Sequence, residues 1–304
     1  MSKSSARFTA KKSFNGELNI NNHPCTTPPK TISSMGRNFT VNMCQPGFSK
    51  TATTKEGIFM AEDDYGESYY YRGAADNWVS FAGFYWRIIR INGDGSIRMI
   101  YSGTKENHTG DGATIGGSPY YYQVYDKEKY ADYKMSYVKY VVDSWYKTNI
   151  LDKGYDNKVA DTGYCNDMTK YDTNNFGSDG RLYYNKAPTL KCPDKASDLL
   201  SKSNNKLTFP VGLITFDEAS FAGGVRDTRY NNYYYLNTEK TYWTMTPAKW
   251  DGSYVYVGVV QYDGLLFSWG VNDFTKGVRP VLSLKPNVLV TSGDGTEASP
   301  YVIN

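Results

Sequence analysis

The chain has 304 residues, enough for one large domain or two modest ones, and its 34 basic and 31 acidic residues leave a net charge of only +3. So small a net charge excludes a strong positive field, and with it the electrostatic basis for nucleic-acid binding. Tyrosine stands out with 29 copies, and its wide ring with a polar tip suits both sheet faces and binding surfaces.

Residues 1–54 are predicted to form a small β-rich N-terminal unit. The stretch "ARFTAKKSFNGELNI" alternates apolar and polar positions around a turn at Asn15-Gly16, and "RNFTVNMC" predicts a further strand. The first residues lack the apolar core of a signal peptide, and no apolar run is long enough to cross a bilayer. We therefore expect no direct membrane insertion.

Residues 55–304 are predicted to form a second, larger domain that begins with the β-rich segments "SYYYRGA", "WVSFAGFYWRIIRI" and "SIRMIYSG". The turn sequence "NGDG" joins the last two and predicts a hairpin. Two helices follow. In "SYVKYVVDSWYKTNILDK", apolar residues recur at i, i+3, i+4 and i+7 from Val138, and "TFDEASFAGG" carries a capping box of Thr215 and Glu218.

After residue 231 the pattern predicts short strands separated by turns, in the segments "YYYLNT", "TYWTMT", "YVYVGVV", "LLFSW", "GVRPVLSL" and, at the end of the chain, "PYVI". The continuous apolar run in "GVRPVLSL" suggests a buried central strand. Because proline cannot donate to a ladder, Pro280 is expected at the start of that strand or at a bulge.

The four cysteines are even in number, and none forms a CxxC pair. The preferred pairing is two disulfides, Cys25–Cys44 and Cys165–Cys192, which implies an oxidising compartment. Four reduced, unrelated thiols are the alternative. We expect no metal site, since the spacing is too wide for a typical ligand set and only two histidines could assist.

The chain is not expected to be an enzyme or to need a cofactor. Its two histidines lie in unrelated loops, so Ser-His-Asp and Cys-His arrangements have little to draw on, and no motif places a pair of carboxylates. The acidic segment "AEDDYGE" could coordinate calcium, but it is more simply an acidic turn beside strands.

The stretch at 242–284 is crowded with large side chains yet interrupted by glycines. Trp243 and Val281 are expected in the core. Trp250 follows Lys249, and Trp269 precedes Gly270, which are turn-like settings where burial is hard to arrange. The residues alone leave core and exposed contact surface equally open for these two tryptophans.

Three segments in particular, "GLITFDEASFAGG", "YWTMTP" and "GVRPVLSLK", resemble the C-terminal half of bacterial and phage proteins with a C-type-lectin-like fold. In several of those proteins the last such segment is the variable region of a diversity-generating retroelement. Upstream, "YYYRGAADNWVSFAGFYWRIIRINGDGSIRMIYSGT" is similar to the same group, so the resemblance covers roughly residues 57–304. It implies an α+β fold with two helices around a small twisted antiparallel sheet that carries long loops.

The resemblance also implies a variable segment at about 242–280 whose altered residues point outward from a rigid frame. Carried over by position, the displayed, ligand-binding set is Ala248, Lys249, Trp250, Gly258, Gln261, Phe267, Trp269, Asn272 and Phe274. The frame residues are Tyr242, Trp243, Gly277, Val278, Arg279 and Pro280.

Two departures from related families limit the function. Sugar-binding lectins hold calcium with a Glu-Pro-Asn or Gln-Pro-Asp triplet plus Trp-Asn-Asp, whereas this chain has only "WGVND" and a distant "QPG". Formylglycine-generating enzymes need a late cysteine pair, and no cysteine follows Cys192.

The predicted function is therefore non-enzymatic binding of a ligand or receptor through a diversifiable surface at about residues 248–274. The partner would be a protein or glycan on another cell or particle, and the location would be extracellular, at a bacterial surface, or on a phage tail. The alternative is a structural or assembly subunit, such as a pilus or tail component, that uses the same surface to form a homo-oligomer.

Overall fold

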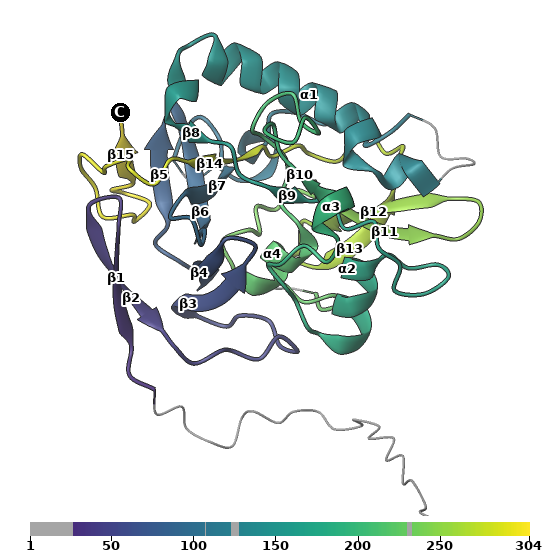
Figure 1. The fold of residues 1–304 in the computed structure, drawn as a ribbon, viewed down its shortest axis with the longest axis horizontal. Helices are drawn as coiled ribbons and strands as arrows, with labels where there is room; N and C mark the ends of the chain where they lie inside the picture. Colours follow the sequence, from purple (N-terminus) through teal and green to yellow (C-terminus); the bar gives the residue numbers. More distant parts are fainter. Residues whose placement is uncertain (1–26, 107, 123–127, 230–232) are drawn as a thin grey trace, which may run out of the picture.

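The computed structural model describes residues 27–106, 108–122, 128–229 and 233–304. Figure 1 shows a large sheet on one side of the molecule and a smaller sheet, β11 to β13, on the other, with α1 running above both. The large sheet has ten strands in the order β1-β2-β3-β4-β6-β7-β14-β8, and β5 and β15 extend it beside β6. Its pairs are antiparallel except β2 with β3 and β5 with β15.

The large sheet is made of β1 (Lys30–Ser34), β2 (Arg37–Asn42), β3 (Lys55–Asp63), β4 (Gly66–Gly73), β5 (Trp78–Phe81), β6 (Phe84–Ile91), β7 (Ile97–Tyr101), β8 (Val159–Ala160), β14 (Val281–Leu284) and β15 (Tyr301–Ile303). The second sheet contains β11 (Tyr242–Trp250), β12 (Val255–Val260) and β13 (Leu266–Gly270). A third pairs β9 (Tyr164–Cys165) with β10 (Leu199–Leu200).

The described helices are short. They are α1 (Tyr137–Tyr146), α2 (Gly177–Gly180), α3 (Lys195–Asp198) and α4 (Phe216–Phe221). Helix α1 continues into the π-helical turn η5 (Lys147–Leu151), and α2 continues into a second one, η7 (Arg181–Asn185). The 3-10 turns are η2 (Gly110–Ala113), η3 (Glu128–Ala131), η4 (Tyr133–Met135) and η6 (Tyr155–Lys158).

The expected C-type-lectin-like α+β fold is wrong. The chain is mostly β, and its main sheet is a large mixed one whose eight-strand path curls into a half-barrel, rather than a small antiparallel sheet between two helices. Most individual strands and helices could be predicted from the sequence, but the pairing of the strands could not. The ladder that joins β7 to β14, for example, sets Ile100 opposite Val281, far away in the chain.

Several local predictions are confirmed. Helix α1 buries Val138 and Val142, and α4 begins with a complete capping box between Thr215 and Glu218. Pro280 lies directly before β14, as expected for a residue that cannot donate to the ladder. The strand predicted at "YYYLNT" is wrong, because residues 233–238 form turns in which three successive side chains are buried rather than alternating.

The predicted boundary at residue 54 is crossed by the main sheet. The hairpin of β1 and β2 joins β3 through parallel pairing of Val41 with Ile58 and Asn42 with Phe59. The strand predicted in "ARFTAKKSFNGELNI" lies outside the described residues.

The predicted Cys165–Cys192 disulfide is confirmed, with the two Cα atoms 5.4 Å apart. Cys25 lies outside the described residues, so its pairing with Cys44 stays a prediction. The described bond closes a polar segment with a sequence separation of 27 that includes α2 and η7.

Replacing both Cys165 and Cys192 with serine should lower the free energy of unfolding by about 3.5 kcal/mol, the loop-closure entropy for a segment of this length. Urea denaturation of the oxidised protein and of the double variant measures the difference. A change below about 1 kcal/mol would mean that the segment is held by its other contacts.

Candidate functional site

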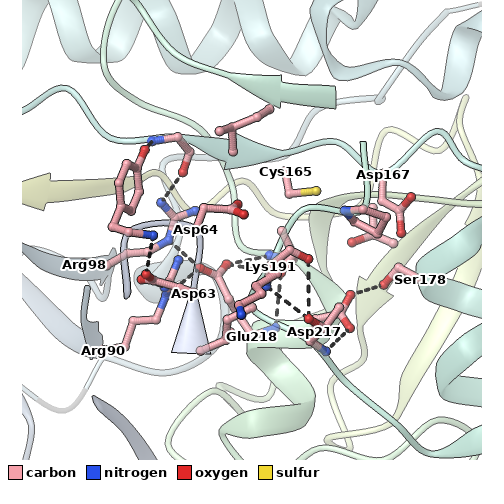
Figure 2. Close-up of a pocket in the computed structure, with 18 of the residues that line it drawn as sticks. Asp63, Asp64, Arg90, Arg98, Cys165, Asp167, Ser178, Lys191, Asp217 and Glu218 are labelled. Carbon is pink, nitrogen blue, oxygen red and sulfur yellow. Dashed lines mark hydrogen bonds and ion pairs between the residues drawn. The ribbon is translucent and has the colours of Figure 1, made fainter. Parts of the chain in front are cut away.

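A small cavity between the main sheet and α4 is lined by charged side chains (Figure 2). It encloses about 30 Å³, room for one or two water molecules. Asp63 ends β3, Arg90 lies on β6, Arg98 on β7 and Glu218 on α4, so the cavity marks where four elements meet.

The charged side chains that line this cavity form ion pairs with one another. The Nη1 of Arg90 lies 2.5 Å from Oδ2 of Asp63, and its Nε lies 3.4 Å from Oε1 of Glu218. Arg98 pairs with the same Glu218 oxygen, and its guanidinium stacks over the ring of Tyr164 at 4.2 Å. Because all four charged side chains are buried, each charge depends on its partner. We refer to Asp63, Arg90, Arg98 and Glu218 as the ion cluster.

A second set of ion pairs continues along the same cavity. Arg181 lies 3.0 Å from Asp217 and 3.3 Å from Asp167, and Asp217 also accepts hydrogen bonds from Ser178 and from the backbone N–H of Thr189. These contacts attach the disulfide-closed segment to α4. The arrangement leaves no room for a substrate, so we assign it a structural role.

The two neighbouring carboxylates of α4, Asp217 and Glu218, have pKa values shifted in opposite directions. Burial alone would raise the pKa of Glu218, but the charges of Arg98 and Arg90 and the backbone N–H of Thr215 outweigh it and hold the pKa below the ordinary 4.5. Burial raises the pKa of Asp217, because the single Arg181 compensates less of the desolvation.

A surface of a different kind lies around β13. It consists of exposed and half-buried aromatic side chains, which pack against one another in three groups. We call it the aromatic surface and define it as Tyr122, Tyr137, Tyr140, Tyr171, Tyr183, Tyr184, Phe267, Trp269 and Phe274.

One part of the aromatic surface connects α1 to the loop after β13. The ring of Tyr122 lies 5.8 Å from that of Phe274 and 4.5 Å from that of Tyr137, and Tyr137 lies 5.7 Å from Tyr140 at the start of α1. In Figure 1, β11 to β13 and the start of α1 lie at the same end of the molecule.

The other part begins on β13 and reaches η7. Phe267 and Trp269 are two positions apart, so they share a face of the strand, and their rings are 6.1 Å apart. Tyr183 packs edge-on against Tyr184 at 4.7 Å, and Tyr184 stacks on Tyr171 at 5.3 Å.

Two cations lie against these rings, and one of them, Arg226, connects Phe267 to Tyr183. The ammonium of Lys276 lies 4.3 Å from the ring of Trp269, and the guanidinium of Arg226 lies 5.2 Å from Phe267 and 5.6 Å from Tyr183. Both cations have carboxylate partners: Lys276 pairs with Asp273 at 2.8 Å, and Arg226 pairs with Asp179 at 2.7 Å. The surface therefore contains cations over rings without a local excess of charge.

The structure separates the predicted ligand-binding residues into three groups. Trp269 is 38% exposed and Phe274 60% exposed, and Asn272 is also exposed. The second group is half-buried and consists of Lys249, Trp250 and Phe267. Their role in binding stays a prediction.

The third group is buried, which corrects the prediction that it is displayed. Ala248 is fully buried beneath residues 174–176, where its carbonyl accepts from the N–H of Phe176. Gly258 faces α4, and a Cβ there would lie 2.5 Å from the ring of Phe216. Gln261 is 7% exposed, at the turn that connects β12 to β13.

Six tyrosines of the aromatic surface were not predicted from the sequence, because they lie outside residues 242–284. The sequence feature that could have indicated them is the high tyrosine content of the chain, 29 residues. They are Tyr122, Tyr137, Tyr140, Tyr171, Tyr183 and Tyr184.

No cluster of three or more potential metal ligands occurs in the described ranges. Within the same ranges, no helix has both the length and the apolar character needed to cross a bilayer. The chain matches no family model, no curated protein and no solved structure.

Glu218→Gln should lower the free energy of unfolding by about 3–5 kcal/mol at pH 7, because it leaves the buried Arg98 without a carboxylate and removes one of the two carboxylate partners of Arg90. The folded pKa of Glu218 is below its unfolded value, so its ionised form stabilises the fold above the unfolded pKa. That stabilisation is lost as the pH falls through the folded pKa. The gap between wild type and variant should therefore narrow below about pH 4.5.

Urea denaturation at pH 7 and at pH 3.5 measures this gap. Ser253→Ala, an exposed change in the turn between β11 and β12, is the control and should follow the wild type at both values. A gap that is independent of pH would contradict the assignment of Glu218 as an ionised centre.

Proposed function

We propose that the chain is a non-enzymatic binding protein that holds a protein ligand on the aromatic surface. The observation that carries the proposal is the gathering of exposed and half-buried rings, in three contacting groups, around the strand β13. Tyrosine and tryptophan offer a large, rigid contact area with few rotatable bonds, and together with arginine they are enriched where binding energy is concentrated.

The position of Trp269 and Phe274 supports this role. Both are exposed, yet Trp269 is held by Lys276 beneath it and by the pairing of β13 with β12, while Phe274 rests against Tyr122. Little side-chain freedom is lost when a partner binds such pre-positioned rings, so more of the contact energy appears as affinity.

The location of the rings favours a protein over a small molecule. The cavities found in the described residues lie elsewhere, and small ligands need concave sites. The paired cations at the surface favour a partner recognised mainly by apolar contact.

The exposed positions also fit the expected capacity for variation. Substitutions at Trp269, Asn272 and Phe274 would leave the core unchanged and should alter stability by about 0.5 kcal/mol or less. The Cys165–Cys192 disulfide is consistent with an extracellular or virion location, which we include in the proposal.

Trp269→Ala and Phe274→Ala should each weaken binding of surface-directed peptides at least about tenfold, or about 1.4 kcal/mol, and change the melting temperature by no more than a few degrees. The probes are peptides selected from a random phage-displayed library against the full chain, with affinities measured by biolayer interferometry.

The matched control is Leu289→Ala, which removes an apolar side chain about as exposed as Phe274 from the segment between β14 and β15. It should leave peptide binding unchanged. Trp243→Ala, in contrast, removes a fully buried side chain and should cost about 3–5 kcal/mol of stability. Selected peptides that bind all surface variants equally would contradict the proposal.

Two other outcomes would replace the protein ligand with a different partner. If a glycan array gives binding that Trp269→Ala abolishes while no peptide is selected, the ligand class is carbohydrate. If sedimentation velocity shows a wild-type dimer that Trp269→Ala dissociates, the partner is a second copy of the chain.

Affinity for the selected peptides should change less than about threefold between 50 and 500 mM NaCl, because Lys276 and Arg226 are already paired with carboxylates. The interferometry measurement repeated across this range checks it. A loss of tenfold or more would mean that free surface charge, rather than the rings, drives binding.

A further inference from the structure

A second cavity lies away from the aromatic surface and the ion cluster. It encloses about 400 Å³, within the usual range for small-ligand pockets. Its walls combine aromatic rings with a few charged groups, and the residues that matter here are Asp76, Trp78, Arg87, Tyr233, Tyr235 and Glu297.

Arg87 is the unusual group in this cavity. It is only 8% exposed, and its hydrogen bonds go to neutral acceptors: Nε donates to Oδ1 of Asn77 at 2.6 Å, and Nη2 donates to the carbonyl of Ala75 at 2.8 Å. Its guanidinium stacks over Trp78 at 4.1 Å and lies 5.2 Å from the ring of Tyr235. Nη1 has no hydrogen-bond partner among the described residues.

No carboxylate of the described residues lies within 4 Å of Arg87, in contrast to Arg90 and Arg98 on the neighbouring strand positions. Arg279 is close enough to act on Arg87 electrostatically, is fully buried, and also lacks a carboxylate partner in the described ranges. Burial lowers the pKa of Arg87 to about 9, and the charge of Arg279 adds to that effect.

A buried cation without a counter-charge is costly, and protein interiors rarely retain one. The hydroxyls of Tyr235 and Thr238, which line the same cavity, are also buried without a hydrogen-bond partner in the described part of the chain. An anionic ligand with oxygen acceptors would supply what these groups lack.

The two acids of the cavity limit how much negative charge it can accept. Asp76 is paired with Lys55, whereas Glu297 has no ion-pair partner among the described residues. A dianionic phosphate would be repelled by Glu297, while a single carboxylate can be balanced by Arg87. The rings of Trp78 and Tyr233 provide apolar walls for the rest of the ligand.

We propose that this cavity binds a small molecule carrying one carboxylate, about the size of a sugar acid, with the carboxylate on the free side of the Arg87 guanidinium. This site is independent of the protein-binding function of the aromatic surface.

The test uses the full chain and D-glucuronate as the probe, with glucose as the neutral control and glucose 1-phosphate as the phosphate control, all at matched ionic strength. Glucuronate should raise the melting temperature in a concentration-dependent way, because a ligand that binds only the folded state stabilises it. Glucose should have no effect, and glucose 1-phosphate a smaller one. Calorimetric titration gives the affinity.

Arg87→Gln should weaken glucuronate binding at least tenfold, while Glu297→Gln, which removes the repelling charge, should strengthen it several-fold. The second variant keeps the test valid if the first does not fold. Trp269→Ala should bind glucuronate like the wild type, which separates this site from the aromatic surface.

The proposal is overturned if glucuronate gives no stabilisation, if glucose stabilises equally, or if Arg87→Gln and Glu297→Gln both leave binding unchanged. Tighter binding of glucose 1-phosphate would also overturn it, since the ligand class would then be a phosphate.

Discussion

The buried carboxylate of Glu218 is the constraint on which the rest of the structure depends. This single side chain accepts from the backbone N–H of Thr215, which starts α4, and it pairs with arginines of two adjacent strands of the main sheet. Helix α4 has only six residues, too few to be stable alone, so its position is set by these contacts rather than by helix propensity. Buried pairs of this kind add little net stability, but a misplaced α4 would leave the charges of Glu218 and Arg98 unpaired, which penalises alternative packings.

Contacts of helix α4 with β11 and β12 position the part of the aromatic surface that lies on β13. Phe216, the first residue of α4, donates its N–H to Thr246 on β11, and its ring fills the space above Gly258 on β12. Strand β13 then pairs with β12 from Val260 to Tyr256, which fixes the direction of Phe267 and Trp269. A path of direct contacts thus leads from the ion cluster through α4 to Phe267 and Trp269.

Features that depend on residues close in the chain could be predicted from the sequence, whereas features that depend on distant segments could not. The capping box, the apolar face of α1, the hairpin at "NGDG" and the nearer disulfide all depend on residues close in the chain, and each is present. The pairing of β7 with β14 and the ion pair between Arg98 and Glu218 depend on segments that only the folded chain brings together. At the candidate site, the family resemblance indicated Trp269 by position, but nothing local indicated that Tyr122 or Tyr183 would extend the same surface. Burial of Gly258 and Ala248 was hidden for the same reason, since their covering residues come from α4 and residues 174–176.

The buried arginines differ in whether a carboxylate of the same chain neutralises them. Six arginines are buried in the described residues, and four of them have a carboxylate partner: Arg72 with Glu56, Arg90 with Asp63, Arg98 with Glu218 and Arg226 with Asp179. Only Arg87 and Arg279 depart from this rule, and Arg87 is the one of the two that lines an open cavity. Arg279 is instead held by the carbonyls of Tyr101 and Leu236 and by the ring of Tyr242. What separates Arg87 from Arg279 is the cavity: a counter-charge can reach Arg87 from outside, which is the arrangement that a binding site for an anion requires.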